Sequence, residues 1–181
     1  MDIVAHGLWA AAAVELARRH VPVSSTVARA TVALAVLPDL VHTLPLALWA
    51  VFGGHDAFAA LSAYAVALPG QEPSMPPWVT LLAHHLHCTA HSAVIAAAVT
   101  LACWVAARSV LPALLGWWSH IVIDVFTHSA DFYPVPVFYP LSERSFDGIA
   151  WNEPWVLTAN YAVLAVLWWW LLHPRRGAAL N

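Results

Sequence analysis

The sequence predicts an all-α, polytopic membrane protein, a helical bundle with about five membrane-embedded helices in a single domain over residues 1–181. Of the 181 residues, 61% are hydrophobic and 9% are charged, whereas about a quarter of a soluble domain is charged. Several apolar stretches also approach the ~20 residues that a helix needs to cross a bilayer. The 11 tryptophans fit this class, because indoles gather at membrane interfaces.

Each apolar stretch is expected to form one helix. The stretches cover approximately residues 3–17, 30–52, 79–107, 110–130 and 155–172. The second and third are longer than a bilayer requires, and the fourth and fifth match it. The first is short, and Glu15 lies near its end, so this helix could be only half inserted. Residues 56–68 have the pattern of a short interfacial helix.

The arginines predict the orientation of these helices. The chain has no lysine, and one side of the five-span arrangement carries Arg18, Arg19, Arg29, Arg108, Arg175 and Arg176. The other side has only Arg144. Because basic residues collect on the cytoplasmic side, the N-terminus is expected outside and the C-terminus in the cytoplasm. The long loops 53–78 and 131–154 then face outward.

The most informative segment covers residues 116–128. It places His120, Asp124 and His128 four residues apart in a stretch that is otherwise apolar. Residues four apart share one face of a helix, and an ionisable residue in hydrocarbon needs a partner, a cavity or a metal. Two imidazole nitrogens and one carboxylate suit zinc or a similar divalent cation.

Further ionisable residues occur at the same predicted depth in the other stretches. A single intramembrane histidine is usually a packing residue bonded to a neighbouring helix. Convergence from four stretches on one level in the outer half of the membrane is hard to explain in that way. The residues expected to converge are His6, Asp39, His91, His120 and Asp124.

Five short motifs resemble one family in the same order along the chain. They are His6-Gly7, Leu-Pro-Asp-x-x-His (37–42), Thr-x-His-Ser (89–92), Gly-x-x-Ser-His-x-x-x-Asp-x-x-Thr (116–127) and Phe-Tyr-Pro-Leu-Ser (138–142). Together they resemble the YdjM-type, inner-membrane-associated, metal-dependent hydrolases, also described as LexA-binding. Two positions depart from the family pattern. Val41 stands where the family often has a second Asp, and any of His84, His85 or His87 could replace the first His of the third motif.

The resemblance implies a location in the inner (cytoplasmic) membrane as a multi-pass protein. The family looks distantly similar to zinc-dependent phospholipases C and single-strand nucleases, which bind clustered zinc with the order His, Asp, His, His-x-x-x-Asp. The matching positions here are His6, Asp39, His91, His120 and Asp124. The similarity implies that Asp124 bridges two metal ions.

We therefore interpret the chain as a phospholipase C-like, metal-dependent phosphoesterase with Asp39 and Asp124 as its catalytic carboxylates. One ion is expected to take Asp39, His91, His120 and Asp124. A second is expected to take Asp124, His6 and the N-terminal region, with His42 or His128 as candidates, and His87 is a further candidate residue of the site. Two zinc ions ~3.5–4 Å apart, or manganese in their place, would activate a hydroxide for attack on phosphorus.

The expected substrate is a membrane lipid or a lipid-linked phosphoester, because the site lies in the outer half of the bilayer. Loop 131–154 would form a lid, and Arg144 could bind a phosphate. A nucleic-acid partner is not expected, since the net charge is −3 and no basic run is present. The sequence does not predict an oligomeric state.

Two other classes of function also place histidines in a membrane. A metal or proton transporter should show polar residues that continue to the cytoplasmic side, where stretches 79–107 and 110–130 are almost wholly apolar. A di-haem protein needs paired histidines but no carboxylates. A non-catalytic, metal-binding or regulatory membrane protein remains open as a third alternative.

Overall fold

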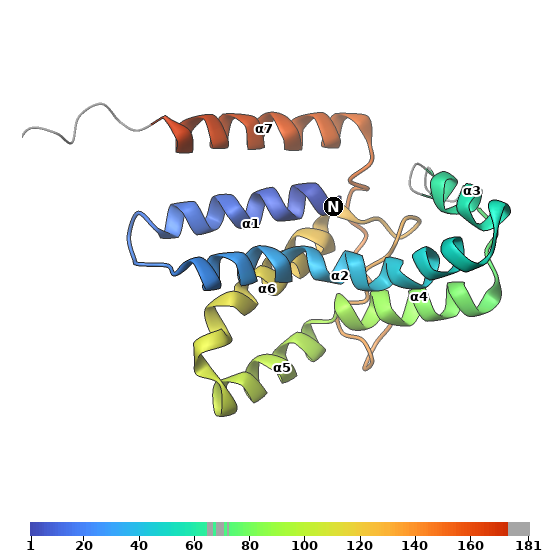
Figure 1. The fold of residues 1–181 in the computed structure, drawn as a ribbon, viewed down its shortest axis with the longest axis horizontal. Helices are drawn as coiled ribbons and strands as arrows, with labels where there is room; N and C mark the ends of the chain where they lie inside the picture. Colours follow the sequence, from blue (N-terminus) through green and yellow to red (C-terminus); the bar gives the residue numbers. More distant parts are fainter. Residues whose placement is uncertain (65–66, 68–70, 72, 174–181) are drawn as a thin grey trace, which may run out of the picture.

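The computed structural model describes residues 1–64, 67, 71 and 73–173, and these residues form helices and loops without a β-strand (Figure 1). The all-α prediction is confirmed. The elements in chain order are α1 (Ile3–Ala17), α2 (Ser25–Phe52), α3 (His55–Tyr64), α4 (Pro77–Ala90), α5 (Ala93–Ala106), the short 3-10 helix η1 (Arg108–Val110), α6 (Leu111–Thr127) and α7 (Pro154–Leu172).

Helix α2 is the centre of the bundle and packs against α1, α3, α4 and α6. Helix α7 lies along α1, and α5 packs against α6. The α1–α2 and α5–α6 connections lie at one end of the molecule, and α3 lies at the other (Figure 1). Elements from both halves of the chain therefore surround α2, which positions it to carry a shared site.

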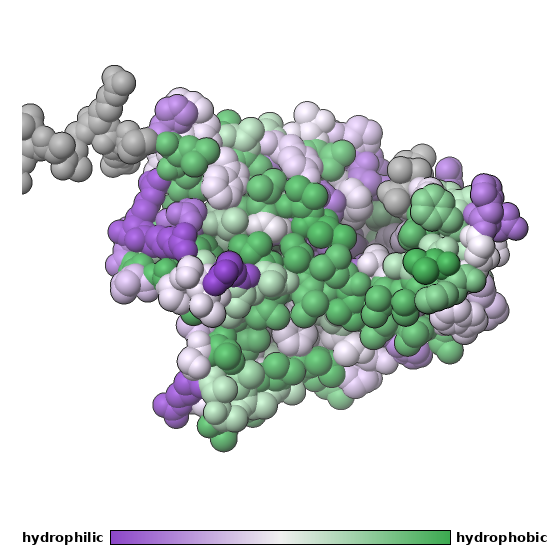
Figure 2. Space-filling model, viewed as in Figure 1, coloured by the Kyte–Doolittle hydropathy of each residue, from purple (hydrophilic) through white to green (hydrophobic). Residues whose placement is uncertain are grey.

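Three helical segments are long and apolar enough to cross a membrane: α2, η1 with α6, and α7. The α4–α5 pair makes a fourth if it counts as one bent span, and α1 is a shorter apolar helix. The structure thus supports three or four spans by length and composition, and the count of five is not supported. A largely apolar surface covers the helices on the face drawn in Figure 2, which is compatible with membrane association.

The single helix expected over 79–107 is wrong in one respect, because α4 and α5 are bent by 56° at residues 91–92. Ser92 caps the new helix, since its hydroxyl accepts a hydrogen bond from the Ile95 N–H at 3.1 Å. The Ala93 N–H donates to the Val137 carbonyl at 2.8 Å, outside the helix. The loop after α6 therefore takes up polar groups that the break exposes.

Local capping chemistry explains where the first two helices begin. Asp2 caps α1, and Ser24 caps α2, each through a side-chain oxygen that accepts a backbone N–H one turn later. Helix α2 therefore starts at Ser25 rather than near residue 30. It continues through Pro38 and Pro45 to Phe52.

Two further expectations fall partly outside the described residues. The short helix expected over 56–68 is present as α3, which ends at Tyr64; residues 65, 66 and 68 are not described. Arg175 and Arg176 also lie outside the described residues.

The loop between α6 and α7 folds back over the end of α6. The N–H groups of Gly148, Ile149 and Trp151 donate to carbonyls of the last helical turn and its cap at 2.9 to 3.0 Å. At Gly148 a Cβ would lie 2.5 Å from the Phe126 carbonyl oxygen, so only glycine allows this approach. The loop is thereby anchored where α6 ends.

Gly116 sets the distance between α6 and α2. A Cβ at this position would lie 1.9 Å from the Thr31 carbonyl oxygen. The two helix backbones therefore meet directly. This contact fixes α6 against the N-terminal half of α2, about two turns before Asp39.

We predict that Gly116→Ala lowers the free energy of unfolding by about 1–3 kcal/mol, because the new methyl group meets backbone that cannot move without separating the helices. Thermal unfolding in detergent measures the change. Gly7→Ala on α1 is the matched control, since its Cβ would make an ordinary 3.4 Å contact with Val36. Equal effects of the two substitutions would contradict the proposed role of Gly116.

Candidate metal centre

Three parts of the bundle bring together four side chains that could hold a metal ion. Asp39 comes from the middle of α2, His91 from the break between α4 and α5, and His120 and Asp124 from α6. Each side chain offers one ligand atom, and these four atoms lie within 4.8 Å of one another. All four residues are buried.

The distances between the ligand atoms match those around a small cation. The Nε2 atoms of His91 and His120 are 2.9 Å apart. They lie 3.2 and 3.0 Å from Asp124 Oδ2, and 3.7 and 3.8 Å from Asp39 Oδ1. Ligands ~2.0–2.1 Å from a tetrahedral zinc ion are about 3.3 Å from one another. The observed separations bracket this value.

Backbone carbonyls orient the two imidazoles. His91 Nδ1 lies 2.8 Å from the His87 carbonyl oxygen, and His120 Nδ1 lies 2.7 Å from the Ala35 carbonyl oxygen. Because a carbonyl only accepts hydrogen bonds, each Nδ1 must donate a proton. In the neutral rings both Nε2 atoms then carry lone pairs, and these lone pairs face each other. Metal-binding histidines are commonly fixed in this way.

The carboxylates of the cluster require positive charge. Asp39 Oδ2 and Asp124 Oδ2 are buried and accept no hydrogen bond from the described residues. The two carboxylates carry a formal charge of −2 in a buried site beside two neutral imidazoles, and the Met1 ammonium, which binds Asp124, offsets only half of this charge. A divalent cation would neutralise this charge and occupy the lone pairs of both Nε2 atoms. The residues present therefore fit a divalent metal ion.

A second set of groups surrounds the other oxygen of Asp124. His6 Nε2 lies 2.9 Å from Asp124 Oδ1, and His128 Nε2 lies 3.5 Å from it. The Met1 amine donates a hydrogen bond to the same oxygen and lies 3.0 Å from His128 Nε2. Burial lowers the pKa of His128, and its Nδ1 donates to the Tyr133 carbonyl. Asp124 thus lies between two groups of nitrogen donors.

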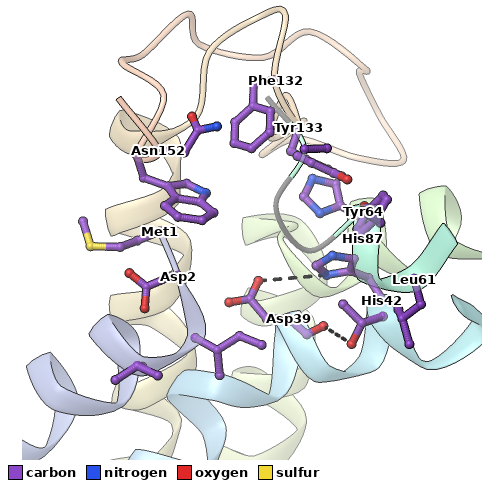
Figure 3. Close-up of a pocket in the computed structure, with 15 residues that line it drawn as sticks. Met1, Asp2, Asp39, His42, Leu61, Tyr64, His87, Phe132, Tyr133 and Asn152 are labelled. Atoms are coloured by element: carbon purple, nitrogen blue, oxygen red, sulfur yellow. Dashed lines mark hydrogen bonds and ion pairs between the residues drawn. The ribbon is translucent and has the colours of Figure 1, made fainter. Parts of the chain in front are cut away.

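A cavity of about 590 Å³ reaches the cluster through Asp39. His42 and His87 line its wall, and Figure 3 shows both imidazoles beside Asp39, with Phe132 and Tyr133 from the loop above them. No arginine occurs among the described residues that line it. The candidate metal-binding cluster is therefore accessible from a cavity that is lined largely by apolar and aromatic side chains.

The structure brings together all five residues that the sequence placed at the centre, and it shows where the further histidine candidates lie. Of the three alternatives in the third motif, His87 is buried at the cavity, whereas His84 and His85 are exposed. His128 is the C-cap of α6 rather than part of the helix, yet it still faces Asp124.

Arg144 is not brought to the site. It is exposed and is not among the residues that line the cavity. The orienting carbonyls of Ala35 and His87 were not predicted, because no side-chain pattern marks a backbone acceptor. The aromatic cavity wall, with Phe132, Tyr133 and Trp151, was signalled only by the aromatic residues of loop 131–154.

Comparisons of the chain with models of protein families, with curated proteins and with solved structures find no significant match. The resemblance to the YdjM-type family therefore stays a prediction that rests on the five motifs. The metal centre rests on the geometry of this chain alone.

We predict that the purified protein binds zinc at this cluster and that Asp124→Asn lowers the affinity at least about tenfold, because one charged ligand is lost without a change in shape. Metal analysis after dialysis and a competitive zinc titration measure the effect. His84→Gln is the matched control, since this exposed histidine of α4 lies outside the cluster. Zinc binding by Asp124→Asn that equals that of the unmodified protein would exclude the site.

Proposed function

We propose that this chain is a membrane-embedded, metal-dependent hydrolase, a phosphoesterase that acts on a membrane lipid or lipid-linked phosphoester. The observation that carries the proposal is the facing pair of imidazole Nε2 atoms between two buried carboxylates, at the wall of a cavity. Two nitrogen and two oxygen donors suit zinc, with manganese as the alternative.

A divalent ion held by this cluster would supply an activated water and an electrophile for a phosphoryl oxygen. The chain's own residues would hold and orient the reacting groups. Asp39 both belongs to the cluster and lines the cavity, so it lies between the metal position and an entering substrate. Asp124 would hold the ion through one oxygen while the other is kept in place by His6 and His128.

Several features of the cavity favour a lipid over a nucleic acid. Its described wall contains the carboxylates of Asp2 and Asp39 and no arginine, so beyond the Met1 amine a polyanion would find little favourable charge there. Ile3, Val4 and Leu61 form part of its apolar wall. One phosphoester could reach the metal ligands from this cavity while its apolar chain stays among apolar side chains.

The loop between α6 and α7 suits the role of a cover over this cavity. Phe132 and Tyr133 lie over the imidazoles in Figure 3, and Trp151 and Asn152 also belong to the wall. The backbone hydrogen bonds that tie Gly148, Ile149 and Trp151 to the end of α6 hold this cover in place. A closed site excludes bulk water, which strengthens the electrostatic interactions within it.

We further propose that the protein resides in the inner membrane, with the arginine-rich end toward the cytoplasm and the cavity toward the outside. The connections that carry Arg18, Arg19 and Arg108 lie at the same end of the bundle, and the loop after α6 lies away from them, over the end of α6 (Figure 1). This separation is the arrangement that the positive-inside rule describes.

The orientation predicts a labelling pattern in intact cells. In a variant with Cys88 and Cys103 replaced by alanine, a cysteine introduced at Ser145 should react with a membrane-impermeant maleimide. A cysteine at Ser109, in η1 at the other end, should react only after the membrane is permeabilised. The reverse pattern would place the cavity on the cytoplasmic side.

The enzyme proposal predicts release of phosphate or head group from phospholipids or polyprenyl phosphates by protein in detergent or liposomes. Activity should fall by about 10²-fold or more in Asp124→Asn and on chelation, because the charge that stabilises the transition state is lost. Addition of zinc or manganese should restore the activity of the chelator-treated native protein but not that of the variant. His84→Gln should retain activity.

If folded, metal-loaded protein releases nothing from any lipid of such a panel, the enzyme proposal is wrong. The same centre would then belong to a non-catalytic metal-binding or regulatory protein, or to a metal transporter.

A further inference from the structure

A second cavity lies between α1 and α2 at the end of the bundle opposite the loop that covers the metal centre. It measures about 460 Å³. Its walls combine small apolar side chains, among them Ala11, Ala28 and Ala33, with Ser25 and two arginines, Arg18 and Arg29. No residue of the metal centre lines this cavity, so it is a separate site.

The charges at this cavity leave a net positive site. Arg18 Nη1 donates to Glu15 Oε1 at 2.5 Å, so these two groups neutralise each other. Arg29 uses only its Nε, which donates to the Ser25 carbonyl at 3.3 Å in its own helix. Within the described part of the chain no carboxylate pairs with Arg29. The two arginines and one glutamate leave a formal charge of +1, equal and opposite to that of one phosphodiester.

The surroundings indicate a ligand that has both a charged and an apolar part. Figure 2 shows hydrophilic side chains gathered at the end of the molecule where α1 and α2 are connected, beside a hydrophobic surface that continues along the helices. Helix α2 is long and apolar enough to cross a membrane, so the groove runs from the charged end toward the hydrocarbon.

We propose that this groove binds one anionic phospholipid, with its phosphodiester at Arg29 and Arg18 and an acyl chain along the alanine and valine side chains between α1 and α2. The guanidinium group of Arg29 can offer two parallel N–H donors to the phosphate oxygens. The Ser25 hydroxyl lies on the same wall, one turn before Arg29, and can donate a further hydrogen bond. A zwitterionic lipid would add an ammonium group, which needs an anionic partner. Glu15 is the carboxylate of this groove, and it is already paired with Arg18.

The bound lipid would hold α1 against α2 at the end where they contribute arginines rather than metal ligands. Because α1 carries His6 and α2 carries Asp39, occupancy of the groove favours the helix arrangement that assembles the metal centre. The lipid site itself depends neither on a bound metal nor on hydrolysis, and it is tested without either.

Native mass spectrometry of the full chain in detergent can test this site, with titrations of phosphatidylglycerol, of phosphatidylcholine with the same acyl chains, and of inorganic phosphate. The unmodified protein should retain one phosphatidylglycerol in preference to phosphatidylcholine and should bind inorganic phosphate only weakly. Arg29→Gln should lower the phosphatidylglycerol affinity about fivefold, the effect of one arginine at a membrane surface. Ala33→Leu, which fills the groove, should weaken both lipids.

Two control variants separate this site from general surface attraction. Arg108 also lies at the arginine-rich end, is exposed, and donates its Nε to a carbonyl one turn earlier, that of Trp104, at 3.2 Å. Arg108 therefore matches Arg29 in exposure and in its hydrogen bond, but it does not line the groove. Arg108→Gln, and Ala98→Leu at an exposed position of α5, should leave lipid binding unchanged.

The proposal would be overturned if Arg29→Gln and Arg108→Gln lowered the affinity for phosphatidylglycerol equally, or if Ala33→Leu had no effect on it. In either case the surface as a whole, rather than the groove, would attract the lipid. Retention of inorganic phosphate as strongly as phosphatidylglycerol would show an anion site without a place for the acyl chain. Thermal unfolding of each variant in detergent separates loss of lipid from loss of fold. A protein without hydrolase activity would still show the lipid pattern if this inference is correct.

Discussion

The close approach of His91 Nε2 and His120 Nε2, at 2.9 Å, is the contact around which the candidate metal centre is arranged. Each ring donates its other nitrogen to a backbone carbonyl, so two lone pairs meet beside two carboxylates. Such a contact is unfavourable unless a proton or a metal cation lies between the groups. The helices that supply these side chains therefore hold them in an arrangement that a divalent ion would stabilise.

The backbone of the bundle is built to keep this arrangement. Gly116 allows α6 to touch α2 near Thr31, and one turn further along α6 His120 reaches the carbonyl of Ala35 on α2. The break at residues 91–92 turns α5 away from α4 and leaves His91 as the C-cap of α4. Since the loop after α6 binds both this break and the end of α6, one segment braces two of the ligand-bearing elements.

Side-chain spacing alone predicted much of the centre. His120 and Asp124 share a helix face at a spacing of four residues, and His6, Asp39 and His91 lie at matching depths in other apolar stretches. Such residues are rare in a membrane-like composition, so their convergence could be inferred without a structure. Helix class and approximate helix positions followed from hydropathy in the same way.

The remaining features depend on contacts between distant parts of the chain. The bend at 91–92 was missed because residues 79–107 have the overall hydropathy of one continuous stretch, and hydropathy does not register a serine that caps a new helix. The choice of His87 over His84 and His85 depends on which face of α4 meets the cavity. Arg144 was a candidate because of its charge and its loop, but the loop directs aromatic side chains rather than this arginine to the cavity wall.

X-ray absorption spectroscopy of the zinc-loaded protein tests the central claim most directly, because it reports the atoms bound to the metal without reference to activity. The account predicts a first shell of nitrogen and oxygen at ~2.0–2.1 Å with the outer-shell scattering of two imidazoles. In Asp124→Asn this shell should change or be lost. A first shell with sulfur at ~2.3 Å, or zinc without imidazole scattering, would contradict the account.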